Sequence, residues 1–353
     1  MISRSSVVSK AGVIEPFLLQ PVGKDYLWGG ERLRTDFGKK LDVYPLAETW
    51  ECSTHSDGIC RVVSGRFKGV GLDKVLEQFP EIAGTNCLNK QGKAVLPILV
   101  KLIDAQQNLS VQVHPSDEYA FERENGQLGK TEMWYVLDAV PGAKLIYGFS
   151  RDMTREFARR CIEQGTIEKY LNHVPIRKDD VFFIPSGQVH ALCAGALVAE
   201  VQQSSNLTYR LYDYDRRGKD GEKRELHIEK ALDVMNVKAV KTLRQPIRIK
   251  RFHPGYATEL LCRCSYFQVE RFLLNVGDNS NVPPAKVSLL TTSFQVLLCT
   301  DGAGVLSWEG AEDARKRGRL SFKRGDCIFL LAASDDLAAV YLSGKAQLLK
   351  VNS

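Results

Sequence analysis

The sequence has 353 residues, enough for two domains of ordinary size with a sizeable core in each. Hydrophobic residues make up 44% and charged residues 25% of the chain, which is typical of a folded globular protein and excludes disorder over most of its length. The 48 basic and 42 acidic residues leave a net charge of +6, a mild excess that does not predict nucleic-acid binding.

The nine cysteines form no CxxC pair, and several lie inside apolar runs. Such a pattern favours reduced thiols in the core of a cytoplasmic protein. The first residues include no apolar segment typical of a signal peptide, and the longest apolar runs, residues 94–100 and 327–333, are far shorter than the roughly 20 residues that span a membrane. We therefore expect no membrane partner.

Short runs rich in Val, Ile, Leu and Phe, separated by glycine and proline, predict a protein made mainly of β-strands. Two segments break this pattern, because apolar residues recur at helical spacing over residues 71–84 and again over residues 151–173. The sequence therefore predicts a sheet core with helical additions.

The segment Leu109–Pro115 alternates strictly, so in a strand Ser110, Gln112 and His114 share one face and the apolar residues share the other. No charged residue occurs in it, which favours an enclosed polar face over one in water. The next strand, predicted over residues 129–137, places Lys130 and Glu132 on one face and runs into an apolar stretch. A buried carboxylate there would need a partner or a metal ion.

Residues 181–192 predict an apolar strand followed by a proline-glycine turn. This turn restricts the backbone and so sets the direction of the His190 imidazole. A weak echo at residues 325–331 lacks the turn and the histidine, so a second, related barrel would have lost its polar site. The polar segment 236–251 is the expected connection. We predict a first domain over residues 1–250 and a second over residues 251–353.

His114, Glu132 and His190 form a two-histidine, one-carboxylate set, with Gln112 as a possible fourth ligand. Such a set suits a divalent metal and leaves a coordination position open, although the residues alone do not distinguish zinc from non-haem iron. A single histidine in an apolar strand is more often an ordinary core residue, and the grouping is what favours a site. Arg210 lies on a predicted strand face, and without further information it is more simply explained as an ion-pair partner of Asp213 or Asp215.

Six segments in order resemble the type I mannose-6-phosphate isomerases, a zinc-dependent cupin family, and the chain is closest to its short bacterial branch. The segments read YLWGG (26–30), AETWE (47–51), LSVQVHP (109–115), GKTE (129–132), FIPSGQVHA (183–191) and EVQQSSNLTYR (200–210). This resemblance implies a double cupin, two jelly-roll-like β-barrels of which only the first binds a metal.

The resemblance further implies that His114, Glu132 and His190 bind one zinc ion per chain and that Arg210 is the catalytic arginine. It makes Lys130 a pocket residue and the candidate base, with a zinc-bound water as the alternative. Gln112 matches a further metal ligand of longer family members.

The implied reaction interconverts mannose 6-phosphate and fructose 6-phosphate through a cis-enediol. Ser110, Lys101, Arg216 and Arg217 are candidates for the phosphate at the rim of the pocket, although a solvated surface position is the favoured explanation for each. Ser53 and His55 are candidates for the cavity mouth, but His55 could equally be an exposed histidine. A cupin iron dioxygenase or a non-catalytic sugar-binding cupin are the competing hypotheses. We expect a monomer or a weak homo-oligomer with a sugar phosphate as its small-molecule partner.

Overall fold

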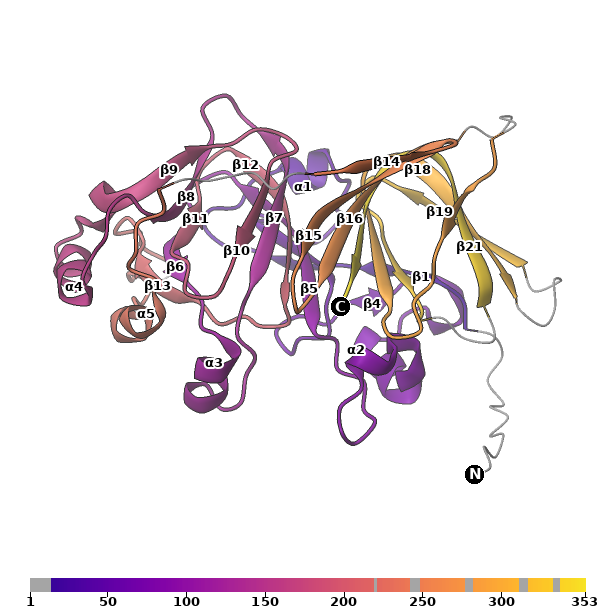
Figure 1. Cartoon of the computed structure of the whole chain (residues 1–353), viewed down its shortest axis with the longest axis horizontal. Coiled ribbons are helices and arrows are strands. Elements are labelled where there is room, and N and C mark those ends of the chain that lie inside the picture. The colour runs from indigo at the N-terminus through magenta and orange to yellow at the C-terminus, as the bar shows by residue number, and fades with distance from the viewer. Residues whose placement is uncertain (1–13, 219–220, 242–247, 277–281, 311–316, 333–336) are drawn as a thin grey trace.

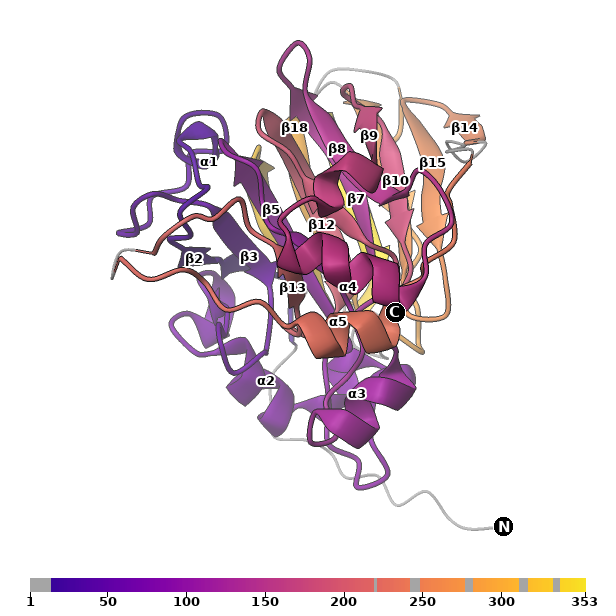
Figure 2. The same ribbon diagram turned by 90° about the vertical axis from the view of Figure 1, so that its left-hand side faces the viewer.

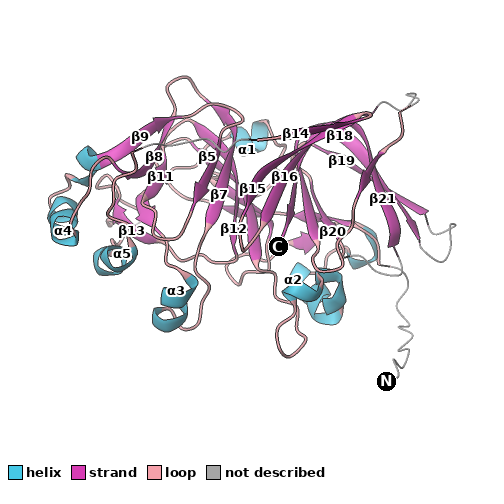
Figure 3. Ribbon diagram, in the orientation of Figure 1, coloured by secondary structure: helices cyan, strands magenta, loops and turns pink. Residues whose placement is uncertain are grey.

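Strands dominate the structure, a computed structural model that describes residues 14–218, 221–241, 248–276, 282–310, 317–332 and 337–353. They form two units that lie side by side along the long axis of the molecule, with helices on the outside (Figure 1, Figure 3). The expectation of a mainly β protein with helical additions is therefore confirmed.

The strands of the first unit and its N-terminal extension are β1 (Phe17–Gln20), β2 (Val22–Lys24), β3 (Glu48–Cys52), β4 (Arg61–Val62), β5 (Ile98–Ala105), β6 (Val111–Val113), β7 (Glu132–Ala139), β8 (Lys144–Phe149), β9 (Leu171–Pro175), β10 (Val181–Ile184), β11 (His190–Leu192), β12 (Ala196–Gln203) and β13 (Tyr209–Tyr212). Those of the second unit are β14 (Lys250–His253), β15 (Tyr256–Arg263), β16 (Gln268–Val276), β17 (Ala285–Val287), β18 (Gln295–Gly310), β19 (Arg317–Lys323), β20 (Cys327–Leu330) and β21 (Leu337–Asn352). The described α-helices are α1 (Arg32–Thr35), α2 (Leu72–Gln78), α3 (Asp117–Arg123), α4 (Arg155–Glu163) and α5 (Ile228–Val234). Short 3-10 helices span Gly65–Phe67, Pro80–Ala83, Thr85–Cys87 and Ile167–Tyr170.

The first barrel consists of two antiparallel sheets. A six-stranded sheet has the order β10-β7-β12-β5-β3-β2, and a five-stranded sheet has the order β13-β6-β11-β8-β9. Side chains of both sheets, among them Trp134 and Val198 from the first and Leu145 and Leu192 from the second, share one buried apolar cluster. The two sheets therefore face each other across a packed interior.

The second barrel is built on a ten-stranded sheet with the order β14-β15-β16-β21-β18-β20-β1-β4, to which β17 and β19 are also paired. Two strands from the N-terminal end of the chain join it, because β1 pairs with β20 and places Phe17 opposite Phe329. The two rings stack with their centroids 5.3 Å apart. The division at residue 250 stays a prediction, and strand pairing crosses it.

Apolar side chains from both units also form one cluster between the barrels, which includes Leu102 and Met133 of the six-stranded sheet and Val269 and Leu349 of the ten-stranded sheet. The outer face of the six-stranded sheet is therefore buried against the second barrel. The opposite surface of the first barrel is covered by α4 and α5, which pack on the five-stranded sheet (Figure 2).

The helix expected over residues 71–84 is confirmed as α2, which buries Leu72, Val75 and Leu76 and ends before Pro80. Proline disfavours helical geometry in the residue that precedes it. The helix expected over residues 151–173 is only partly right, because α4 ends at Glu163. Residues 171–175 form β9 instead and pair with β8, so tertiary pairing decides their conformation.

No described helix has the length and apolar character that a membrane crossing requires. All nine cysteines are free thiols, as the sequence predicts, and seven of them are buried.

Candidate active site

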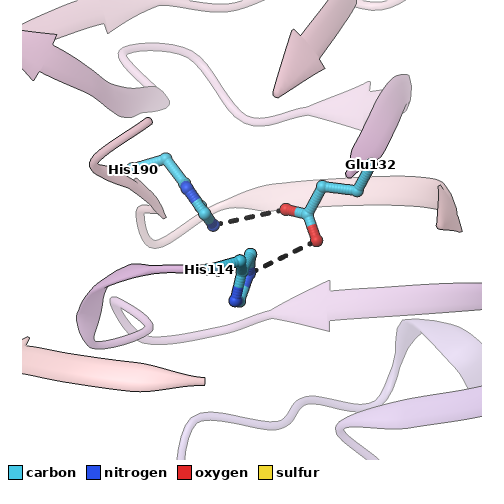
Figure 4. Close-up of side chains that lie close together, drawn as sticks. All are labelled: His114, Glu132 and His190. Atoms are coloured by element: carbon cyan, nitrogen blue, oxygen red, sulfur yellow. Dashed lines mark ion pairs between the residues drawn. The ribbon is translucent and has the colours of Figure 1, made fainter. Parts of the chain in front are cut away.

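Three side chains from the two facing sheets meet inside the first barrel (Figure 4). His114 follows β6 and His190 begins β11, both in the five-stranded sheet, whereas Glu132 begins β7 in the six-stranded sheet. His114 Nε2 lies 3.5 Å from Glu132 Oε2, and His190 Nε2 lies 3.3 Å from Glu132 Oε1. One potential ligand atom from each residue falls within 4.8 Å of the others.

The turn before β11 fixes the position of His190 relative to His114. Gly187 has φ +81°, which a side chain would strain, and a Cβ there would come within 2.8 Å of the Val234 carbonyl oxygen. The backbone N–H of Gly187 donates to the carbonyl oxygen of His114 at 2.8 Å. The proline-glycine turn therefore ties the two histidines to each other through the backbone.

Hydrogen bonds from the far side of each ring set the tautomers of the two imidazoles. His114 Nδ1 lies 2.9 Å from the Leu207 carbonyl oxygen, and His190 Nδ1 lies 2.8 Å from the Gln188 carbonyl oxygen. A carbonyl oxygen only accepts, so each Nδ1 is the donor. In a neutral ring Nε2 then keeps its lone pair, and both lone pairs are available in the group around Glu132.

The group is buried and incompletely satisfied. Glu132 is fully buried, and neither of its carboxylate oxygens nor His114 Nε2 has a hydrogen-bond partner. Burial alone would raise the pKa of Glu132, but the charge of Lys130 holds it well below its usual range. Burial and the Lys130 charge lower the pKa of His114 to about 3. An ionised carboxylate beside neutral imidazoles, with buried acceptor atoms unused, is a donor set that fits a divalent cation.

The other predicted site residues surround this group. Lys130 Nζ lies 3.4 Å from Glu132 Oε2, and Lys130 precedes β7 rather than lying on it. Gln112 Nε2 lies 3.5 Å from His190 Nε2, so the amide nitrogen, which is not a metal ligand, is the group that faces the histidine. Ser110 is 4% exposed and lines the adjoining cavity.

A cavity of about 420 Å³ opens beside the histidine-glutamate group. Gln112 and Lys130, which contact that group, are part of its wall. The other lining residues are Tyr26, Trp28, Glu48, Lys101, Ile103, Leu109, Ser110, Glu124, Trp134, Glu200, Asn206, Leu207, Thr208, Tyr209, Arg210, Arg224, Glu225, His227 and Lys230. Polar and charged side chains thus converge on a space of the size that holds a small ligand.

A buried charge cluster that sequence reasoning missed lies on the cavity wall. Lys101 is 3% exposed, and its Nζ lies 3.0 Å from Glu200 Oε1 and 3.6 Å from Glu48 Oε2. Burial would lower the pKa of Lys101, but the two carboxylates raise it above its usual value. The expectation of a solvated lysine at the rim is therefore wrong. The available signal was a lysine inside the apolar run 98–105.

Arg210 lies on β13, lines the cavity and has no ion-pair partner within the described ranges. Asp213, one of the carboxylates considered for it, is instead held by Arg216 and Arg224, and Asp215 pairs with Lys223. Arg210 Nη1 donates to the Glu225 carbonyl oxygen at 3.0 Å, and its buried Nε has no partner. The ion-pair explanation for Arg210 is therefore wrong.

The remaining phosphate and mouth candidates lie elsewhere. Arg217 is exposed and donates to the Gly221 carbonyl oxygen. Arg216 does not line the cavity, and Ser53 and His55 are also absent from its wall. Ser53 is fully buried, and the ring of His55 packs edge-on against Trp50.

Two barrels of antiparallel strands, the first with a buried His/Glu/His group beside a cavity, define a double cupin with one candidate metal site among the described residues. The sequence model described as phosphomannose isomerase type I, catalytic domain, matches residues 17–132. A probable mannose-6-phosphate isomerase of Bacillus subtilis is 46% identical over 231 residues, which are 65% of this chain and 71% of the relative. A mannose-6-phosphate isomerase of the same organism is 38% identical over 281 residues, 80% of this chain and 86% of the relative.

The crystal structure of a Bacillus subtilis mannose 6-phosphate isomerase superposes with a TM-score of 0.82 at 32% identity, covering 95% of this chain and 99% of the other. The chain therefore belongs to the type I phosphomannose isomerase family, and it is an isomerase with the double-cupin fold expected from its motifs.

Proposed function

We propose that this protein interconverts mannose 6-phosphate and fructose 6-phosphate as a zinc-dependent isomerase. The observation that carries the proposal is the buried His114, Glu132 and His190 group, with its unused acceptor atoms, beside a polar cavity. The family to which the chain belongs, and the names of its relatives, supply the substrate.

His114 Nε2, His190 Nε2 and a Glu132 oxygen would hold the zinc ion. When bound, the ion supplies a Lewis acid for the sugar oxygen at C1 or C2. Three protein ligands leave a coordination position open for substrate. The backbone carbonyls that accept from the two Nδ1 atoms keep the imidazoles oriented, so little reorganisation accompanies binding. Gln112 would ligate only after its amide turned, and we propose it as an accessory ligand.

Lys130 and Arg210 would supply the catalytic groups other than the metal ion. Isomerisation moves a proton between C1 and C2 through a cis-enediol, and interactions that strengthen as charge develops are the catalytic ones. We assign the transfer of that proton to Lys130, because it contacts Glu132 and lines the cavity. Arg210 has an unsatisfied buried Nε and no ion-pair partner in the described structure, so it can stabilise the developing enediolate. Ser110 would bind a sugar oxygen.

The decisive experiment is a coupled assay that follows fructose 6-phosphate formed from mannose 6-phosphate. We expect metal-dependent turnover by the wild type, loss of turnover in His190→Ala, and wild-type turnover in His173→Ala, which removes an exposed histidine on β9. The proposal is wrong if the wild-type protein shows no metal-dependent conversion of mannose 6-phosphate to fructose 6-phosphate.

Metal analysis separates this function from its two rivals. Protein purified without added metal should contain one zinc per chain, whereas stoichiometric iron with oxygen consumption would favour a cupin dioxygenase. Sugar-phosphate binding without turnover would indicate a non-catalytic cupin. We also propose that the enzyme is cytoplasmic and acts as a monomer or weak homo-oligomer, which sedimentation analysis tests.

A further inference from the structure

Lys130, to which the proton transfer is assigned, lies on a short connection and not on a strand. In the described structure residues 128–131 belong to no helix or strand, and β7 begins only at Glu132. The Lys130 side chain is nevertheless buried, with its Nζ 3.4 Å from Glu132 Oε2. A group that moves a proton needs a closely fixed position, and a connection without the hydrogen bonds of a sheet does not provide it by itself.

Two side chains hold the backbone on either side of Lys130. The N–H of Gly129 donates to Asp117 Oδ1 at 2.8 Å, and the N–H of Thr131 donates to Gln203 Oε1 at 2.8 Å. Gln203 Nε2 donates to the same Asp117 oxygen at 2.8 Å, so the two side chains are joined to each other. Asp117 and Gln203, here called the Asp117–Gln203 pair, therefore fix the residues before and after Lys130.

Backbone contacts place the same connection against the start of α3. The N–H of Lys130 donates to the Pro115 carbonyl oxygen at 3.0 Å. A Cβ at Gly129 would lie 2.5 Å from the backbone nitrogen of Asp117, which is too close for any side chain, so this approach requires glycine. Because Pro115 directly follows His114, these contacts also join the connection to the backbone that carries a histidine of the metal group.

The Asp117–Gln203 pair joins elements that are far apart in the sequence. Asp117 begins α3, whereas Gln203 ends β12 and is 3% exposed. The hydroxyl of Tyr266, between β15 and β16 of the second barrel, also hydrogen-bonds to Asp117. Burial and this hydrogen bond raise the pKa of Tyr266 to about 12, so the hydroxyl keeps its proton and donates it to the carboxylate. The second barrel therefore contributes to the support of Lys130.

We propose that Asp117 and Gln203 are positioning residues that hold Lys130 in place for proton transfer. The inference rests on the proposed isomerase function, because that function gives Lys130 its task. Neither residue is among the described residues that line the cavity, so an effect of either on the reaction would have to pass through the connection that they hold. Hydrogen bonds to a carboxylate are stronger than those between neutral groups, which suits Asp117 as the centre of this support.

The test compares Asp117→Ala with Glu118→Ala in the zinc-loaded protein. Glu118 is an exposed carboxylate in the same first turn of α3, and its loss should leave kcat at the wild-type value. We expect Asp117→Ala to lower kcat by about 10- to 100-fold, with zinc content and KM for mannose 6-phosphate retained, because a displacement of about 1 Å has an effect of this size. Asp117→Asn keeps an accepting oxygen and should restore most of the activity.

A Lys130→Gln background separates positioning from a general loss of folded protein. If Asp117 acts through Lys130, Asp117→Ala should lower kcat by less than about twofold once Lys130 is already replaced. An equal loss in both backgrounds would overturn the inference. If a melting curve shows that Asp117→Ala does not fold, Gln203→Met, which removes both side-chain hydrogen bonds of Gln203, decides by the same comparison.

Hydrogen–deuterium exchange keeps this inference separate from the isomerase activity. Asp117→Ala should speed exchange in the peptide that contains residues 128–131, and Glu118→Ala should not. If the wild type shows no turnover but exchange rises in Asp117→Ala, the proposed function fails while the hold of Asp117 on the connection is supported. If exchange is unchanged, or if it rises while kcat stays at the wild-type value, the positioning role is overturned.

Discussion

Arg271 is a buried cation of the second barrel that also contacts the first, and replacing it should destabilise the whole protein. It lies on β16 of the second barrel and donates through Nη1 to Tyr135 OH at 2.9 Å and to Asp179 Oδ1 at 2.7 Å, both in the first barrel. Its Nη2 pairs with Glu259 on β15. Arg271 and Glu259 are 4% and 3% exposed.

The size of the effect follows from what Arg271→Met leaves behind. Glu259 would remain buried, with Arg248 at 3.6 Å as its nearest described cation. Breaking a buried ion pair by removing one partner costs about 3–5 kcal/mol, because the other charge stays desolvated. Cooperative unfolding of 353 residues has an entropy of about 0.7 kcal/mol per kelvin, so the melting temperature should fall by about 4 to 7 °C.

Differential scanning calorimetry of the metal-loaded protein measures this shift. Arg251→Met, which removes an exposed arginine from β14 in the same sheet, should melt with the wild type. In the double variant Arg271→Met/Glu259→Gln the stranded charge is gone, so most of the lost stability should return. A single variant as stable as the wild type, or a double variant no more stable than the single, would refute this reasoning.

Three further predictions concern the site. Chelation should lower the melting temperature in a thermal shift assay by about 4 °C, because a metal present at 100 times its Kd stabilises the fold by about 2.7 kcal/mol. In Glu132→Gln, which lacks a ligand, chelation should no longer change the melting temperature. Arg210→Ala should reduce kcat by about 100-fold or more with zinc retained by metal analysis, whereas loss of zinc would make its role structural. Lys101→Met should lower the free energy of unfolding by about 3–5 kcal/mol in a denaturant titration, because it leaves Glu48 and Glu200 buried without their cation.

Local periodicity predicts much of the first barrel. Strict alternation in Leu109–Pro115 predicts His114 on a polar face. The structure has a shorter strand there, Val111–Val113, with His114 directly after it in the histidine-glutamate group and Ser110 and Gln112 in the cavity wall. The proline-glycine turn predicts a restricted backbone just before His190, and Gly187 does form a turn there with φ +81°. Both features depend on a few consecutive residues, which is the range over which a sequence pattern determines backbone geometry.

Long-range pairing is what the sequence did not reveal. Lys101 looks like a rim residue because its carboxylate partners are 53 and 99 residues away, and only the registers of β3 and β12 against β5 bring them together. The prediction of a helix beyond residue 163 is wrong for the same reason. Pairing of β9 with β8 overrides a helical spacing that is present in the sequence.

The second barrel supports the site even though the described part of it holds no group of metal ligands. It covers the outer face of the six-stranded sheet, where Met133 follows Glu132 directly on β7 and is fully buried in the cluster between the barrels. Arg271 holds Tyr135 on the same strand, and Gln347 of β21 donates to the same hydroxyl at 3.0 Å. Alternation along β7 therefore sends one set of side chains, which includes Glu132, into the first barrel and the other set toward the second barrel. Because both sets lie on one strand, the packing between the barrels helps to fix the position of the carboxylate.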